Sequence, residues 1–324
     1  MTEYRNRTTQ TKQMYKQQKE QFGAFDKLTF FNETSGNGFS VVPEVGGTIL
    51  EIWLKGESVL AGCVSPEELE NNQDYKSALL FPFPNRLKDG KYQLNGRDYQ
   101  FPINNALTDN ALHGLGREVK MDVLASEVTT SQASITLSYF NEGIDKAYPF
   151  AFLFDVVFSM SEETGFEVKM KFTNEANENI PVGIGWHPYF KIGDTVEGLN
   201  LKIPDCKMIE IDERMIPTGT LLDYDYFDKP RMIGKAVLDN GFKLSNEQGR
   251  KEVLLADQNF TLKYWQETGS GKFNFLQIYT PPSRTCIAIE PMTCNIDAFN
   301  NRDGLLLLAP EESVEAACGI QLEG

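Results

Sequence analysis

Two histidines and one glutamate are the residues of this chain whose side chains are best suited to moving protons. The 324-residue chain has only two histidines, His113 and His187. Histidine titrates closest to neutral pH, although a single histidine in a protein more often has a structural role than a catalytic one. Glu290 lies at the end of the apolar run 287–289. These three residues are therefore candidates for acid/base chemistry.

The local sequences around the histidines predict constrained backbones. Pro188 disfavours the helical region for the residue before it, so His187 is expected to be extended. Gly114 and Gly116 follow His113 and indicate a loop whose backbone closely approaches another group. Both imidazoles are thus expected in turn-bounded settings.

Glu290 is placed by strand periodicity. On a strand, Ile287 and Ile289 share one face, whereas Ala288 and Glu290 share the other. If the isoleucines enter the core, Glu290 faces a surface left open by the small alanine. An ion-paired residue at a sheet edge is the alternative interpretation.

The elements that carry these residues are predicted to be strands. Residues 166–173 alternate apolar and polar side chains without a break, which is typical of a strand with one face in solvent. Less regular runs of the same kind cover residues 134–140, 152–160, 273–280 and 286–290. Many short strands favour antiparallel sheets, because a parallel sheet needs regular alternation with helices. We predict one all-β domain over residues 25–324, preceded by an N-terminal extension, residues 1–24.

Only two segments have helical features. Ser65, Pro66 and Glu68 form an N-cap serine, a first-turn proline and an acidic third helical position, which predicts a short helix. Residues 11–22 are rich in lysine and glutamine and are expected to form a frayed helix outside the core.

Composition limits the classes of partner and the cellular location. With 46 acidic and 31 basic residues, the net charge is −15 and no basic patch is evident, which disfavours nucleic acid and anionic membranes as partners. No long apolar run predicts a membrane span, and the N-terminal residues do not resemble a secretory signal. Five cysteines without a CxxC pair predict neither a disulfide framework nor a zinc cluster. We expect a soluble cytoplasmic protein.

Several segments, in this order, resemble the aldose 1-epimerase (galactose mutarotase) family. The resemblance covers about residues 39–322. It rests on VVPEVGGT (41–48), FPNRLKDGKY (83–92), LHG (112–114), HPYF (187–190), IPTG (216–219), LDNGF (238–242), IEP (289–291) and DAFN (297–300). It implies a large antiparallel β-sandwich, of the galactose mutarotase-like supersandwich type, with an open sugar cleft on one sheet.

The same resemblance implies roles for individual residues. Glu290 matches the general base of the family, and His187 matches its general acid. His113, Arg86 and Asp239 match the residues that hold the sugar hydroxyls and the ring oxygen. Asn85, next to Arg86, and Trp186, whose ring would stack on a sugar face, are further expected sugar-binding residues. Without the resemblance, an arginine or an aspartate in such a turn would be interpreted as a surface residue, and the tryptophan as a core residue.

The implied reaction interconverts the α and β anomers of a free aldohexose such as galactose or glucose. Glu290 would take the proton of the C1 hydroxyl while a protonated His187 gives one to the ring oxygen, and the roles reverse on closure. An anionic Glu290 would favour a cationic His187. The reaction requires no cofactor or metal. The expected partner is a small sugar, and the expected state is a monomer or weak homodimer.

Two alternatives remain open from the sequence. The run from His113 to Arg117 also resembles the His-Gly-Phe-x-Arg motif of a hexose-6-phosphate 1-epimerase branch, in which Arg86 and Arg117 would bind a phosphate. Leu115 stands where many family members have a second glycine, which leaves substrate preference open. The other alternative is a carbohydrate-binding protein of this fold that has lost catalysis.

Overall fold

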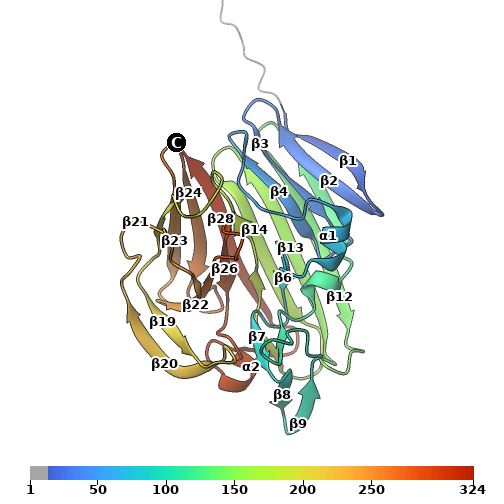
Figure 1. Cartoon of the computed structure of the whole chain (residues 1–324). Coiled ribbons are helices and arrows are strands. Elements are labelled where there is room, and N and C mark those ends of the chain that lie inside the picture. The colour runs from blue at the N-terminus through green and yellow to red at the C-terminus, as the bar shows by residue number, and fades with distance from the viewer. Residues whose placement is uncertain (1–13) are drawn as a thin grey trace, which may run out of the picture.

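The computed structural model describes residues 14–324, which form a nearly all-β molecule whose sheets pack face to face (Figure 1). All strand pairs within the named sheets of this part of the chain are antiparallel, as the sequence predicts. None of its helices is long and apolar enough to cross a membrane. All five cysteines are free and buried.

The largest sheet has nine strands and forms one wall of the molecule. In spatial order they are β11 (Asp122–Val128), β12 (Gln132–Glu142), β13 (Ala151–Ser161), β14 (Gly165–Asn174), β28 (Ser313–Glu323), β24 (Thr261–Thr268), β23 (Gly249–Ala256), β18 (Asn200–Lys202) and β21 (Arg231–Met232). The alternation predicted at 166–173 is confirmed, because Phe166, Val168, Met170 and Phe172 are fully buried and the residues between them are not. The inner face of this sheet is therefore a continuous apolar layer.

An eight-stranded sheet packs against that layer and carries Glu290. Its order is β20 (Pro217–Tyr224), β19 (Cys206–Ile211), β22 (Asp239–Leu244), β25 (Phe275–Tyr279), β26 (Ile287–Met292), β16 (Gly185–Trp186) and β6 (Leu79–Leu80), and β17 (Tyr189–Phe190) also pairs with β26. Aromatic contacts join the two sheets: Phe190 lies 6.1 Å from Tyr264, and Phe166 lies 6.2 Å from Trp186, between ring centroids. The inner face of the eight-stranded sheet is therefore covered by the core, and its outer face remains available for a functional site.

The remaining strands form smaller units. A five-stranded sheet contains β1 (Lys16–Phe22), β2 (Phe25–Asn32), β3 (Asn37–Val42), β4 (Thr48–Leu54) and β5 (Glu57–Ser58). Two-stranded ribbons pair β7 (Arg86–Lys88) with β10 (Asn110–Leu112), β8 (Lys91–Leu94) with β9 (Arg97–Gln100), and β15 (Ile180–Val182) with β27 (Leu306–Leu308). The β7–β10 ribbon brings Arg86 opposite Leu112, one residue before His113.

The helices are few and short. They are α1 (Pro66–Asn71), α2 (Ala298–Asn301) and a 3₁₀ turn η1 (Gly116–Glu118). The predicted start of α1 is confirmed, since the Oγ of Ser65 accepts a hydrogen bond of 3.2 Å from the backbone N–H of Glu68.

The helix predicted for residues 11–22 is wrong over its described part. Residues 11–13 lie outside the described residues, and Lys16–Phe22 is strand β1, which pairs with β2 along its whole length. Gly23, at φ 65°, closes the hairpin between them. Ion pairs between Lys19 and Asp26 (2.7 Å) and between Lys27 and Glu20 (2.5 Å) add to this pairing. The partner strand thus overrides the helical propensity of lysine and glutamine.

Candidate functional site

Glu290 and His187 meet on the outer face of the eight-stranded sheet. Glu290 lies on β26, and its Oε1 is 3.4 Å from the Nε2 of His187, which lies between β16 and β17. Ile287 and Ile289 enter the main core, so the predicted assignment of faces on β26 is confirmed. Glu290 and His187 are 2% and 6% exposed. A carboxylate and an imidazole are therefore held together within a largely dry site.

The backbone around His187 fixes its position. Its N–H donates to the carbonyl of Ala78 (3.0 Å), and its own carbonyl accepts from the N–H of Ser77 (2.8 Å). The imidazole stacks on the ring of Tyr189, with centroids 5.0 Å apart. Among the described residues, neither the Nδ1 of His187 nor the Oε2 of Glu290 has a hydrogen-bond partner. Buried polar atoms without partners are uncommon in native structures, so these two are available to a ligand.

His113 is locked in one tautomer by its neighbour. The N–H of Asn85 donates to the Nδ1 of His113 (3.1 Å), and the N–H of His113 donates to the carbonyl of Asn85 (2.9 Å). Both residues have left-handed backbones, with φ of 63° for His113 and 58° for Asn85. Because Nδ1 accepts a hydrogen bond, the proton of the neutral ring lies on Nε2. His113 is thus prepared as a hydrogen-bond donor.

The same histidine bears on metal binding. Ligand atoms of His113, His187 and Glu290 lie within 4.8 Å of one another, and these residue types can hold a metal ion. To bind a metal through Nε2, His113 would have to move its proton to Nδ1 and lose the bond from Asn85. The arrangement therefore suits a hydroxyl-bearing ligand better than a metal.

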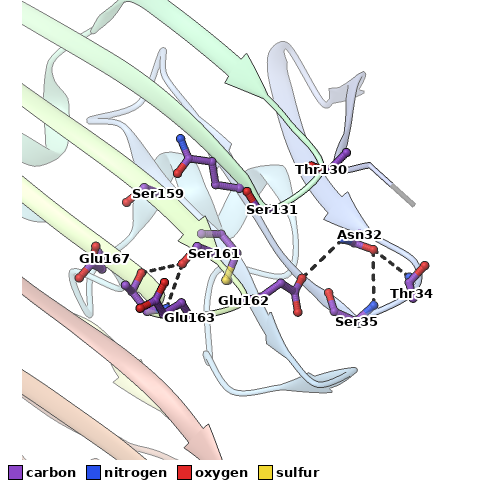
Figure 2. Close-up of a pocket in the computed structure, with 13 residues that line it drawn as sticks. Asn32, Thr34, Ser35, Thr130, Ser131, Ser159, Ser161, Glu162, Glu163 and Glu167 are labelled. Atoms are coloured by element: carbon purple, nitrogen blue, oxygen red, sulfur yellow. Dashed lines mark hydrogen bonds between the residues drawn. The ribbon is translucent and has the colours of Figure 1, made fainter. Parts of the chain in front are cut away.

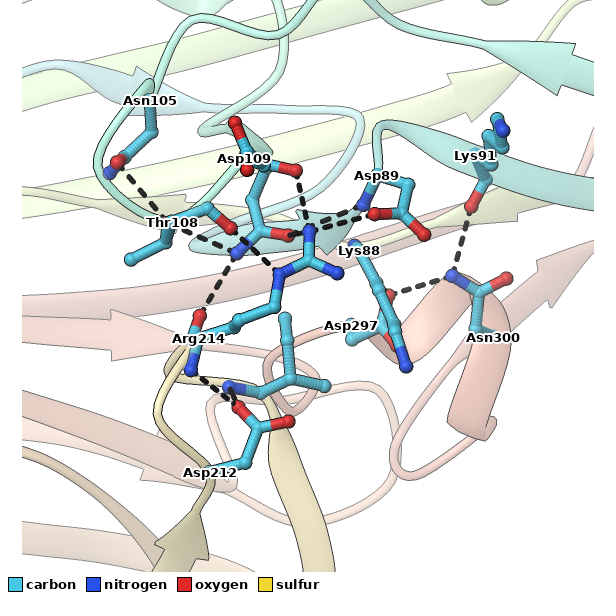
Figure 3. Close-up of polar contacts among 12 residues, drawn as sticks. Lys88, Asp89, Lys91, Asn105, Thr108, Asp109, Asp212, Arg214, Asp297 and Asn300 are labelled. Atoms are coloured by element: carbon cyan, nitrogen blue, oxygen red, sulfur yellow. Dashed lines mark hydrogen bonds and ion pairs between the residues drawn. The ribbon is translucent and has the colours of Figure 1, made fainter.

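Arg86 is positioned by α2 and its N-cap residue. Asp297 donates its N–H to the carbonyl of Arg86 (2.8 Å), and its Oδ1 accepts from the N–H of Lys88 (2.9 Å) and the amide of Asn300 (2.7 Å) (Figure 3). The guanidinium Nη1 of Arg86 donates to Oδ1 of Asn85 (3.1 Å). The Nε of Arg86 has no partner among the described residues. A fixed cation with a free donor therefore remains beside the acid/base pair.

Asp239 and Gln277 complete the polar lining. Asp239 begins β22, and its Oδ1 accepts a hydrogen bond of 2.8 Å from the side-chain amide of Gln277. Gln277 lies on β25 directly opposite Glu290 in the sheet register, is buried, and has an Oε1 without a partner among the described residues. Sequence reasoning missed Gln277. The signal was available, because Gln277 is the polar residue between apolar Leu276 and Ile278.

These residues line one pocket with a volume of about 390 Å³. Its aromatic and apolar lining comprises Tyr75, Tyr189, Tyr279, Leu107, Leu112 and Met215, none of which sequence reasoning proposed. Small-molecule sites typically combine such surfaces with a few convergent polar groups. Six of the seven predicted catalytic and sugar-binding residues meet here: Glu290, His187, His113, Arg86, Asp239 and Asn85.

Comparison with known proteins shows the family to which this sequence belongs. Residues 33–321 match the family model described as aldose 1-epimerase. The chain belongs to the aldose 1-epimerase family. It is 28% identical over 283 residues to the uncharacterized protein YihR of Escherichia coli K12, covering 85% of this chain and 87% of that protein. It is 25% identical over 246 residues to the galactose mutarotase of Sus scrofa, covering 70% and 65%.

Solved structures share the fold of this aldose 1-epimerase family member. A galactose mutarotase-like protein from Clostridium acetobutylicum superposes with a TM-score of 0.85 at 22% identity, covering 96% of this chain and 99% of that chain. The galactose 1-epimerase of Lactobacillus acidophilus gives a TM-score of 0.79 at 17% identity, with coverage of 95% and 98%. The expected galactose mutarotase-like sandwich is confirmed.

Trp186 is the predicted site residue that the structure does not bring to the pocket. It is fully buried in the main core, where its ring lies 6.2 Å from those of Phe166 and Phe190. Trp186 precedes His187, and successive residues of an extended chain point to opposite sides. In this member of the aldose 1-epimerase family, the tryptophan supports the sheet from inside while the histidine faces the pocket.

Burial changes the charge state that the sequence suggested for the pair. Desolvation lowers the pKa of His187 to about 3. Desolvation, with a smaller contribution from Asp239, also raises the pKa of Glu290 well above its usual value. Both shifts run against the expectation of a cationic His187 beside an anionic Glu290. When the pair shares one proton, burial favours its location on Glu290, because this leaves both buried side chains neutral.

A larger cavity, of about 530 Å³, lies elsewhere in this aldose 1-epimerase family member (Figure 2). It lies beside the β2–β3 turn and the ends of β12 to β14, where serine, threonine and glutamate side chains line it. Glu162 there accepts hydrogen bonds from Asn32 (3.5 Å) and Tyr15 (3.2 Å). Among the described residues, its lining has no histidine and no buried carboxylate, in contrast to the smaller pocket with Glu290 and His187.

Proposed function

We propose that the chain is an aldose 1-epimerase that interconverts the α and β anomers of a free aldohexose such as galactose or glucose. The observation that carries the proposal is the 3.4 Å approach of Glu290 to His187 in a buried pocket lined by hydrogen-bonding side chains. Ring opening requires one proton to leave the C1 hydroxyl and one to reach the ring oxygen. A carboxylate and an imidazole that share a single proton supply both transfers.

The roles follow from that shared proton. In the reactive form, anionic Glu290 accepts the C1 hydroxyl proton and protonated His187 donates to the ring oxygen. After ring opening, with the open-chain sugar bound, the proton lies on Glu290 and His187 is neutral, which is the arrangement that burial favours. Rotation about C1–C2 and the reverse transfers then close the ring on the other face. The reaction restores the pair without exchange with solvent.

The other polar residues are proposed to hold the sugar. His113 donates from Nε2, Arg86 donates from its unpartnered Nε, and Gln277 accepts at its unpartnered Oε1. Asp239 accepts sugar hydroxyls beside them. Each buried atom gains a partner only when the sugar is bound, which favours hydroxyl-rich ligands over apolar ones.

Rate should depend on pH with a bell-shaped profile whose acid limb lies unusually low. The active pair carries one proton, and a second is gained only near the lowered pKa of His187, about 3. The raised pKa of Glu290 places the loss of the first proton above the usual range of a carboxyl group. We expect kcat/KM, measured by polarimetry with the buffer rate subtracted, to hold as the pH falls from 7 to 5. An acid limb centred near the ordinary histidine pKa of 6.5 would contradict this.

The charges of the pocket favour a neutral sugar over a sugar phosphate. Arg86 is the only cation in the pocket lining of the described chain, beside the carboxyl groups of Asp74, Asp239 and Glu290. Arg117 is absent from this lining; its guanidinium stacks on the pocket-lining ring of Tyr75, 4.8 Å from the ring centroid, and pairs with Glu118. A pocket lined by Arg86 without Arg117 supports the free-sugar proposal over the two-arginine phosphate site of the hexose-6-phosphate alternative.

This leads to a substrate prediction that tests the proposed function. Polarimetric rates with freshly dissolved α-glucose and α-galactose should exceed those with the corresponding 6-phosphates at equal concentration, because a phosphate would add negative charge beside the carboxyl groups of Asp74 and Asp239. The uncatalysed rate of each sugar in the same buffer is the control. Faster conversion of the 6-phosphates would favour the phosphate branch. Sugar binding without any acceleration would favour a binding protein.

A further inference from the structure

Two loops that form the mouth of the sugar pocket are joined by one arginine (Figure 3). One loop, residues 212–216, connects β19 to β20 and places Met215 in the pocket lining. The other, residues 101–109, connects β9 to β10 and contributes Leu107 and Thr108 to the same lining. Arg214 extends from the first loop into the second. The mouth is thus built from segments that are about a hundred residues apart in sequence.

Arg214 makes contacts that a simple surface ion pair lacks. Its Nε donates to the carbonyl of Thr108 (3.0 Å), and its Nη2 donates to the carbonyl of Asp109 (2.8 Å) and to Oδ1 of Asn110 (3.2 Å). The same Nη2 pairs with Oδ1 of Asp89 at 2.7 Å. In return, the side-chain amide of Asn110 donates to the carbonyl of Arg214 (3.0 Å). The guanidinium fork therefore fixes both position and orientation.

Asp212 holds the loop in the conformation that presents Met215. Its Oδ1 accepts hydrogen bonds of 2.9 Å from the N–H groups of both Arg214 and Ile216. Its carbonyl accepts from the N–H of Met215, also at 2.9 Å. Met215 has a φ of 60°, which is uncommon for a residue with a long side chain and persists where the surroundings enforce it. The hydrogen bonds of Arg214 and Asp212 hold Met215 in this backbone conformation.

In the loop of residues 101–109, Leu107 is not held in place by packing against the core. Its side chain is 98% exposed although it lines the pocket. Its neighbours Thr108 and Asp109 are held through their carbonyls by Arg214. Within its own loop, Thr108 donates from its hydroxyl to Oδ1 of Asn105 (3.2 Å), so bonds from both loops hold the backbone that carries Leu107.

We propose that Arg214 is a positioning residue that sets the mouth of the sugar pocket by fixing Met215 against the loop that carries Leu107. This inference rests on the proposed function. Arg214 is absent from the pocket lining, and its effect passes through Met215 and Leu107, which belong to that lining. A preformed mouth lowers the ordering cost of binding. The acid/base pair lies on other elements. The contacts of Arg214 with the loop of residues 101–109, here called the clamp, therefore contribute to affinity and not to the chemical step.

The test compares Arg214→Gln and Arg214→Lys with Lys207→Ala as the matched control. Lys207 pairs with Asp223 on the same β19–β20 hairpin, is exposed, and does not line the pocket. We expect Arg214→Gln to raise KM about tenfold, as for the loss of a charge-assisted hydrogen bond, while kcat stays within about twofold. Arg214→Lys, which retains the charge near Asp89 but not the fork, should be intermediate. Lys207→Ala should match the wild type.

Hydrogen exchange provides a readout that does not depend on turnover. Amides of residues 105–110 and 212–216 should exchange faster together in Arg214→Gln, and neither segment should change in Lys207→Ala. Unchanged KM in both Arg214 variants, or faster exchange confined to residues 212–216, would overturn the proposal. If Arg214→Gln does not fold, Arg214→Lys decides by the same two readouts. A wild-type protein without epimerase activity would defeat the proposed function, whereas the exchange data would still test the clamp.

Discussion

Glu290→Gln is expected to lower kcat for anomer interconversion by about 10²–10⁴-fold, the range for one positioned proton transfer. Glutamine has the shape of a protonated glutamate, and burial raises the pKa of Glu290 well above its usual value, which favours an uncharged side chain at this position. The variant should therefore fold and bind sugar, since His113, Arg86 and Gln277 are untouched. It lacks the carboxylate that takes the C1 hydroxyl proton.

Polarimetric kcat together with calorimetric sugar affinity measures these two effects separately. Glu315→Gln is a matched control, because Glu315 pairs with Lys169 (3.0 Å) on the nine-stranded sheet, away from the pocket. The control should retain wild-type kcat. If Glu290→Gln keeps kcat within about tenfold of the wild type, then Glu290 is not the base.

His187→Asn is expected to lower kcat over a similar range, about 10²–10⁴-fold. Asparagine is polar and can still donate a hydrogen bond to a ring oxygen, but it cannot transfer a proton to it. The loss should appear in kcat more than in KM, because the interaction that disappears is specific to the transition state.

The control for His187→Asn is a check that the variant retains the wild-type fold. Its backbone bonds to Ala78 and Ser77 do not involve the imidazole, so near-ultraviolet circular dichroism and thermal unfolding should remain close to those of the wild type. Near wild-type turnover in a folded His187→Asn protein would remove the acid assignment and leave Glu290 acting with a different donor.

Local sequence signals predicted the elements whose partners are encoded nearby. The alternation at residues 166–173 predicted β14 because one face of that strand is core and the other is not. The serine and proline at 65 and 66 predicted α1 because capping is a local interaction. Strand β1 was missed because its strand character comes from pairing with β2, and its own residues favour a helix.

The sequence predicted which polar residues form the site. It did not predict the pKa shifts of Glu290 and His187 or the loops that line the pocket. Glu290, His187, His113, Arg86 and Asp239 converge as the family resemblance implied. Trp186 was expected to stack on a sugar face, but it enters the core, because successive residues of an extended chain point to opposite sides and His187 faces the pocket. The lowered pKa of His187 reflects burial, which depends on segments distant in sequence. For the same reason, the sequence offered no signal for Arg214 and its contacts.

The rate of anomer exchange at equilibrium is the most direct test of the central claim. Two-dimensional NMR exchange spectroscopy of glucose and galactose measures transfer of magnetisation between the α and β C1 protons without a change in composition. Added wild-type protein should give exchange cross-peaks that grow with its concentration, and equal amounts of Glu290→Gln should not. If the wild-type cross-peaks equal those of buffer alone for both sugars, the proposed aldose 1-epimerase activity on these free sugars is contradicted.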